Sequence, residues 1–169
     1  MPNRPSRRFL VVLVLVLFSV ICFAQSGDQM SYASVSSTRF APLPVLPTCM
    51  TLSAVHGDPT QGAATILAKA TAGCVIPWHW HTANEQLIFV AGTATVEPKG
   101  AAGHDMKGGD FIFLPAKQTH QFTCTATCVF YDVIDGAFDI HYVDKDGNEI
   151  PTAELLKKLP KPAPPKKGQ

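Results

Sequence analysis

Between residues 43 and 150 the apolar positions fall in short runs rather than at helical spacing. The runs ATILAKA, QLIFVA, TATVE, DFIFL and CVFYDVI are rich in valine, isoleucine, phenylalanine and threonine, and polar stretches with glycine or proline separate them. Such runs have the length and composition of β-strands. Several short strands at this spacing predict an all-β domain, either a small sandwich or a barrel.

The first 24 residues have the three parts of a secretory signal peptide. Arginines precede an apolar run that starts at Phe9, and small residues stand near Ala24. The run from Phe9 to Ala24 has 16 residues, fewer than the roughly 20 that span a bilayer, which favours cleavage over a retained anchor. We expect cleavage after Ala24, no stable membrane span afterwards, and an exported, periplasmic or extracellular protein with a flexible leader over residues 25–42.

The C-terminal residues 151–169 differ in charge from the predicted domain. They begin with TAELLKKL, which predicts a short helix ended by Pro160, and five lysines and four prolines follow Leu156. We expect a disordered basic tail after the helix. Residues 40–150 hold five lysines and 11 acidic residues, a net charge of −6. This charge gives no reason to expect a nucleic-acid partner.

The stretch HWHTANE, residues 79–85, places three metal-ligand side chains within seven positions. His79 and His81 are two residues apart at the end of an expected strand, so their side chains project from the same face. The polar TAN turn lets the chain reverse, which brings Glu85 back beside them on an adjacent strand. A fourth candidate, His120, follows the turn PAKQT.

The first of these segments resembles the first motif of the cupin superfamily. That motif is a glycine, five residues, two histidines separated by one residue, three or four residues, a glutamate, six residues and a glycine. Gly73, His79, His81, Glu85 and Gly92 keep every interval.

The second segment resembles the second cupin motif less completely. Gly109, Pro115 and His120 fit it. Lys117 stands where the motif has a glycine, and Cys124 stands where it has an asparagine. These departures concern a turn and a backbone-supporting position rather than the ligands.

The resemblance covers about residues 43–150 and extends to small exported bacterial single-domain cupins. It implies a single-domain cupin β-barrel, also called a double-stranded β-helix or jelly roll, with one divalent metal inside. The implied ligands are His79, His81, Glu85 and His120. Three neutral imidazoles and one carboxylate suit iron, manganese, zinc or nickel, and they leave two positions of an octahedral ion open. The resemblance also implies a homodimer.

Two functions are open at this point. The first is a metal-dependent enzyme on a small organic substrate, either a dioxygenase-like oxidoreductase, an isomerase or a decarboxylase. The second is a non-catalytic cupin that binds a small ligand or senses a metal. We expect no second carboxylate, arginine or lysine to point into the cavity, which keeps the second function open. Lys117, in the turn before His120, is the nearest candidate. No catalytic residue is assigned.

Four cysteines remain after signal cleavage, at positions 49, 74, 124 and 128. An even number in an oxidising compartment indicates disulfides. Cys124 and Cys128 flank TAT, an expected hairpin turn, so a cross-strand bridge is expected between them. That would leave Cys49 with Cys74, although spacing alone does not determine the connectivity.

Overall fold

The computed structural model describes residues 30–159 of the chain. The predicted signal peptide (1–24), the first part of the predicted leader (25–29) and the tail from residue 160 lie outside the described residues. In chain order the described elements are β1 (Met50–Gly57), β2 (Ala64–Ala70), β3 (Val75–Trp80), β4 (Glu85–Pro98), β5 (His104–Lys107), β6 (Phe111–Leu114), β7 (His120–Ile134), β8 (His141–Tyr142) and α1 (Thr152–Lys158). The all-β prediction is confirmed, and the helix expected at 152–159 is α1.

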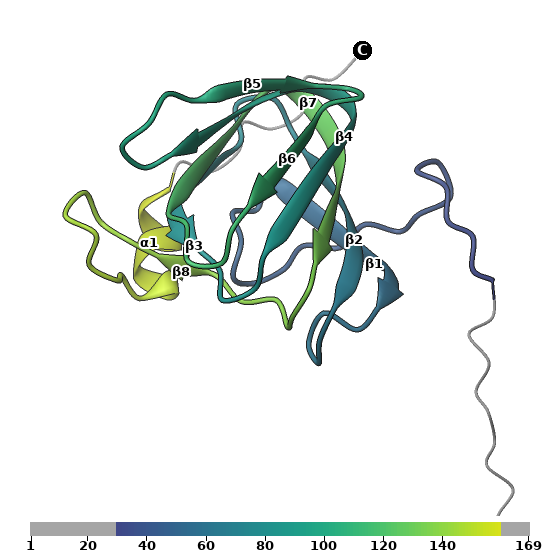
Figure 1. The fold of residues 1–169 in the computed structure, drawn as a ribbon, viewed down its shortest axis with the longest axis horizontal. Helices are drawn as coiled ribbons and strands as arrows, with labels where there is room; N and C mark the ends of the chain where they lie inside the picture. The colour runs from purple at the N-terminus through teal and green to yellow at the C-terminus, as the bar shows by residue number, and fades with distance from the viewer. Residues whose placement is uncertain (1–29, 160–169) are drawn as a thin grey trace, which may run out of the picture. The chain divides into compact units, whose positions relative to one another are not determined.

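The strands form one curled antiparallel sheet, seen as a barrel in Figure 1. β7 is central to it, because it pairs with β2, β3 and β4. β1 continues the sheet beyond β2, β8 continues it beyond β3, and β5 and β6 both pair with β4. The short helix α1 lies beside β8 (Figure 1).

The two long strands, β4 and β7, each take part in two walls of the barrel. Residues 85–91 of β4 pair with residues 129–134 of β7, and with β1, β2 and β6 they make the first wall. Residues 94–98 of β4 pair with residues 120–124 of β7, and with β3, β5 and β8 they make the second wall. Each end of β7 therefore belongs to a different wall.

The walls meet at a bend in both strands, residues 91–94 of β4 and 124–128 of β7, which we call the corner. The ladder between the two strands shifts its register between Phe89 and Ala94, and such bulges bend a strand. Gly92 has a φ of +78°, and a Cβ there would overlap the carbonyl oxygen of Thr127. The corner can therefore form only around a glycine at this position.

Apolar side chains from both walls fill the interior. Phe89 and Phe130 come from the first wall and Phe122 from the second, with ring centroids 5.2 to 6.4 Å apart. Their burial follows the alternation expected of strands, since Phe122 and Phe130 lie at inward positions of β7. This packed core supports the residues at the strand ends.

Three predictions about the strands are wrong. The TAT segment, residues 125–127, is the bulge of a continuous β7 rather than a hairpin turn. The runs QLIFVA and TATVE are parts of the single strand β4, and the polar stretch expected to separate TATVE from DFIFL contains β5. Bulges and turns use the same small polar residues, so local composition did not distinguish a bend from a reversal.

The cysteines lie close to the corner. The predicted bridge between Cys49 and Cys74 is confirmed. Cys124 and Cys128 are buried free thiols, so the second predicted bridge is not formed, although their Sγ atoms are 2.6 Å apart across the bulge. The backbone amide of Cys124 donates to the carbonyl of Cys74 at 2.8 Å, which joins the disulfide to the corner.

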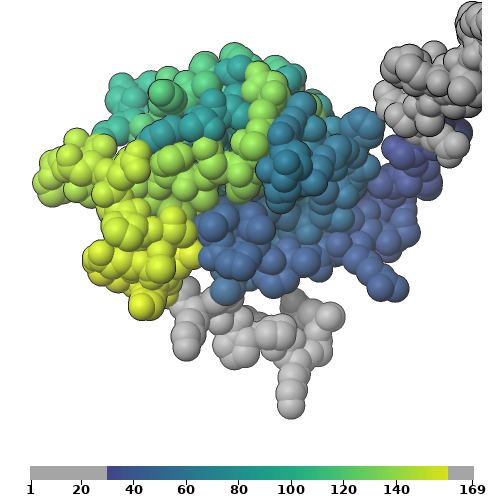
Figure 2. Space-filling model, turned by 90° about the horizontal axis from the view of Figure 1, so that it is seen from below, coloured from purple at the N-terminus to yellow at the C-terminus, as the bar shows by residue number. Residues whose placement is uncertain are grey.

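The segment before β1 lies against the barrel. Ala41 forms a β-bridge with Leu52, and the hydroxyl of Tyr142 donates to the carbonyl of Val45 at 2.9 Å. Leu46 is buried in the core. Figure 2 shows this part of the chain, in blue, next to the C-terminal part, in yellow. Within residues 30–159, no helix has the length and hydropathy needed to cross a membrane.

Candidate metal centre

The four predicted ligands come from two walls of the barrel. His79 lies near the end of β3 and pairs with His120, the first residue of β7, in the second wall. His81 directly follows β3, and Glu85 is the first residue of β4, in the first wall. All four side chains are buried, with 3 to 6% of each residue exposed.

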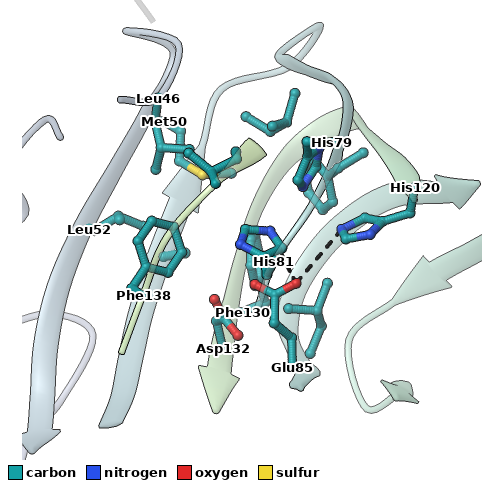
Figure 3. A pocket seen from close by; sticks show the side chains of 15 residues that line it. Leu46, Met50, Leu52, His79, His81, Glu85, His120, Phe130, Asp132 and Phe138 are labelled. Atoms are coloured by element: carbon teal, nitrogen blue, oxygen red, sulfur yellow. Dashed lines mark ion pairs between the residues drawn. The ribbon is translucent and has the colours of Figure 1, made fainter. Parts of the chain in front are cut away.

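The structure brings these side chains together around one point. Ring nitrogens of His79, His81 and His120 all lie within 4.8 Å of one another. Glu85 Oε2 lies 3.2 Å from His81 Nε2 and 3.7 Å from His120 Nε2, as the dashed lines in Figure 3 show. The two sequence segments therefore meet inside the barrel.

Glu85 reaches the histidines by a different route from the one expected. β3 pairs with β7 and β8, and no ladder joins it to β4, so the prediction of ligands on adjacent strands is wrong. The turn crosses from one wall to the other. It is held there by the Asp139 carboxylate, which accepts from the amide and hydroxyl of Thr82, and by Asp135, which accepts from Asn84.

Backbone carbonyls determine which nitrogen of each imidazole faces the centre. The Nδ1 atoms of His79 and His120 lie 2.6 Å and 2.9 Å from the carbonyls of Pro77 and Gln118. His81 Nδ1 makes the same contact with the carbonyl of Asp139. Because a carbonyl only accepts, each Nδ1 carries a proton, and each Nε2 is left with a free lone pair. This is the second-sphere arrangement that orients histidine ligands of metals.

Burial keeps the three histidines neutral. It lowers the pKa of His79 well below its ordinary value, with the neighbouring His120 and His81 adding to the effect. It also lowers the pKa of His81 to about 4 and lowers the pKa of His120. Neutral imidazoles are the form that binds metals.

The donor set fits a divalent cation. Three inward lone pairs and a carboxylate repel one another unless a cation or a proton lies between them. Burial and the nearby Asp132 raise the pKa of Glu85 well above its ordinary value, so this carboxyl holds a proton when no cation neutralises it. A divalent ion would replace that proton and satisfy all four groups.

Asp132 is a pocket residue that the sequence did not predict. It lies on β7, is 7% exposed and lines the same cavity as Glu85, so the expectation of no second carboxylate in the cavity is wrong. Burial raises the pKa of Asp132 to about 7. A signal was present in the run CVFYDVI, where one acidic residue shares the inward side with Phe130 and Ile134.

The site opens into a small apolar cavity of about 50 Å³. Besides the polar residues, its walls include Leu46, Met50, Leu52, Phe138 and Ile140. The Phe138 ring lies 5.4 Å from that of His81, centroid to centroid. A space of this volume holds about one or two water molecules.

The second motif forms the turn before His120. Lys117, which replaces the motif glycine, has a φ of +61°, and among the described non-glycine residues it alone has a positive φ. Its amide donates to the carbonyl of His81 at 2.8 Å. Lys117 therefore adopts, with strain, a backbone conformation that favours glycine, the residue of the motif at this position, and the turn connects the two ligand segments.

Comparison with known proteins agrees with this architecture. Residues 67–134 match the family model described as Cupin domain. The described structure resembles an RmlC-like cupin protein from Ralstonia eutropha, with a TM-score of 0.58 and 18% identity over 77% of this chain and 84% of that one. The fold is that of a cupin.

Two further similarities come from proteins with assigned roles. An acetylacetone dioxygenase from Acinetobacter johnsonii has a similar cupin structure, with a TM-score of 0.55 and 18% identity over 76% of this chain and 90% of that one. The curated DNA damage-repair/toleration protein DRT102 of Arabidopsis thaliana is 29% identical over 111 residues, which are 64% of this chain. This match spans about a third (33%) of the length of the Arabidopsis protein.

Proposed function

We propose that this protein is a metal-dependent cupin enzyme that binds one divalent ion through His79, His81, Glu85 and His120 and acts on a small organic molecule. The observation that carries the proposal is the set of three buried imidazoles, each with Nδ1 turned to a backbone carbonyl and Nε2 turned to a common point. Burying these polar groups costs stability, and apolar side chains would pack the interior better. The arrangement therefore favours a ligand-binding role over a purely structural one.

The protein orients the imidazoles and lines the site with apolar side chains. A bound metal would supply a Lewis acid or an oxygen-activating centre with open positions. The carbonyls of Pro77, Gln118 and Asp139 hold the imidazoles, and the apolar wall with Leu46 and Phe138 limits access of water. Excluding water strengthens electrostatic interactions inside the cavity.

A dioxygenase-like reaction is the form of this proposal that we favour. The acetylacetone dioxygenase has the same fold, and three histidines with a carboxylate suit iron or manganese as well as zinc or nickel. The reaction class and the metal belong to the proposal, because one cupin barrel hosts many reactions.

A non-catalytic cupin is the second candidate. The cavity of about 50 Å³ favours it, because organic ligands commonly occupy pockets of roughly 300 Å³ or more. In that case the protein would bind or sense the metal, or a very small ligand, without turnover. Dioxygen consumption by the iron-loaded protein with catechols, flavonols and diketones separates the two functions.

Export and dimerisation complete the proposal. The Cys49–Cys74 disulfide supports an oxidising compartment, as expected after removal of residues 1–24. N-terminal sequencing of the exported protein should begin at Gln25, and an intact Met1 would contradict cleavage. Sedimentation of the purified protein tests the homodimer.

Elemental analysis tests the metal site. The purified wild type should contain about one divalent metal per chain. His81→Ala should lose most of it, while His104→Ala, at an exposed histidine outside the site, should keep it. A metal-free wild type, after exposure to iron, manganese, zinc and nickel in turn, would reject the proposal.

A further inference from the structure

The Asp132 carboxyl has one oxygen without a hydrogen-bond partner. Among the described residues, Asp132 Oδ1 is the one buried side-chain nitrogen or oxygen atom that lacks a partner. The residue lines the metal cavity, and Figure 3 shows its carboxyl next to that of Glu85. A buried acceptor without a donor is costly, so such an atom marks a place where a bound molecule can donate a hydrogen bond.

An apolar groove lies directly outside the cavity. It has a volume of about 390 Å³, which is in the range of small-molecule sites. Its lining is mainly apolar, and none of its residues in the described chain is charged: Ala41, Pro42, Leu43, Val45, Leu52, Ser53, Ala54, Pro59, Thr60, Ile66 and Phe138. A neutral, apolar ligand body suits this surface.

Leu52 and Phe138 belong to both spaces. Each lines the metal cavity on one side and the groove on the other, so these two side chains form the partition between them. Neither is fully buried, and Phe138 lies in the loop after β7, outside any strand. Joining the small cavity to the larger groove requires the Phe138 side chain to rotate away from its present position.

We propose that the two spaces form one binding site for a neutral molecule with a hydroxyl head and an apolar body. The hydroxyl donates to Asp132 Oδ1 beside the metal position, and the body passes Phe138 into the groove. This inference deepens the proposed function and rests on it for the role of the metal. The assignment of the hydroxyl head rests on Asp132, and the assignment of the apolar body rests on the groove.

Matched probes test the head. 1-Octanol and 1-methoxyheptane are isomers with similar apolar bodies, but only the alcohol can donate a hydrogen bond. Isothermal titration calorimetry on the zinc-loaded full chain should show about tenfold tighter binding of the alcohol. In Asp132→Leu this preference should fall to within about twofold. Asp132→Asn keeps an acceptor oxygen and should retain most of it.

A second pair of variants tests the body. Ala54 is exposed on β1 and lines the groove, so Ala54→Trp should weaken 1-octanol binding several-fold while leaving 1-propanol unchanged. His56→Trp, at an exposed position of the same strand outside the groove, should have no effect on either alcohol.

The outcomes separate this inference from the proposed function. Metal content of each variant is measured alongside binding, and a wild type that binds none of iron, manganese, zinc and nickel rejects the function, whatever the alcohols do. Equal binding of alcohol and ether by the wild type, or a preference that survives in Asp132→Leu, rejects the hydroxyl head. Unchanged 1-octanol binding in Ala54→Trp rejects the groove.

Discussion

The ends and the middle of the strand pair β4 and β7 differ in what they bury. At the ends, Glu85, His120 and Asp132 are polar groups in a dry interior. Burial shifts the pKa of each of them in the direction that favours the neutral form. In the middle, Gly92 and the two corner cysteines pack without charge and without spare space. The same two strands therefore carry buried polar groups at their ends and a closely packed bend between them.

The difference separates what holds the fold from what performs its chemistry. The corner sets the angle between the walls, and that angle brings residues from the two ends of β7 to the same cavity. Substitutions at the corner should therefore change stability, and substitutions at the ends should change metal binding and the dependence on pH.

The largest effect is expected at the corner itself. Gly92→Ala places a Cβ against the Thr127 carbonyl and 2.6 Å from the Cα of Cys128, at a φ of +78°. The free energy of unfolding should fall by about 4 kcal/mol. Gly73→Ala is the matched control, with the same φ and open space, and should lose only about 1 kcal/mol. If urea denaturation shows equal losses of unfolding free energy in Gly92→Ala and Gly73→Ala, the corner is packed no more closely than the turn at Gly73.

The disulfide beside the corner should have the next largest effect. Cys49 and Cys74 are 25 residues apart, and closing a loop of that length stabilises a protein by about 3 kcal/mol. The double variant Cys49→Ala, Cys74→Ala should lose this amount in urea denaturation, and reduction of the wild type should reproduce it. If reduction leaves the unfolding midpoint unchanged, the bridge does not support the corner.

At the site end, Asp132 should make stability depend on pH. Its pKa is raised from 3.8 to about 7, so the folded protein binds this proton more tightly than the unfolded chain. The stability it contributes is complete below pH 3.8 and is lost as pH rises through 7. In chelator-treated protein, Asp132→Asn should remove about 2 to 3 kcal/mol of the decline between pH 5 and 8. The control Asp146→Asn, at an exposed position, should follow the wild type, and an unchanged slope in Asp132→Asn would contradict burial of this carboxyl.

The smallest effect is expected at the turn that joins the ligand segments. Lys117 has a φ of +61° and an exposed side chain, so Lys117→Gly should relieve strain and stabilise the protein by about 1 kcal/mol. Lys117→Ala keeps the strain and should leave the unfolding free energy within about 0.5 kcal/mol of wild type. If glycine and alanine have the same effect, the turn is not strained.

The sequence predicted the fold class and the side chains that gather at the site, because both depend on local spacing. Strand composition gave the all-β class, and the intervals around His79, His81 and Glu85 matched a known motif. The route of Glu85 could not be predicted, since spacing does not tell which wall a strand joins.

The remaining errors share one physical cause. A bulge and a turn have similar composition, so the pattern around TAT predicts a hairpin where the structure has the corner at residues 124–128. The run CVFYDVI indicates that Asp132 shares the inward side with Phe130 and Ile134, but without the bend it does not show that this side faces the metal cavity. That one of its oxygens lacks a partner depends on the residues packed around it in the folded barrel, which no local pattern encodes.

The most direct test of the central claim is the anomalous scattering of crystals grown with zinc. We predict one peak about 2.0 to 2.2 Å from the Nε2 atoms of His79, His81 and His120 and from a Glu85 oxygen. A zinc-saturated crystal with no peak there, or with its strongest peak at Cys124 and Cys128, would contradict the account.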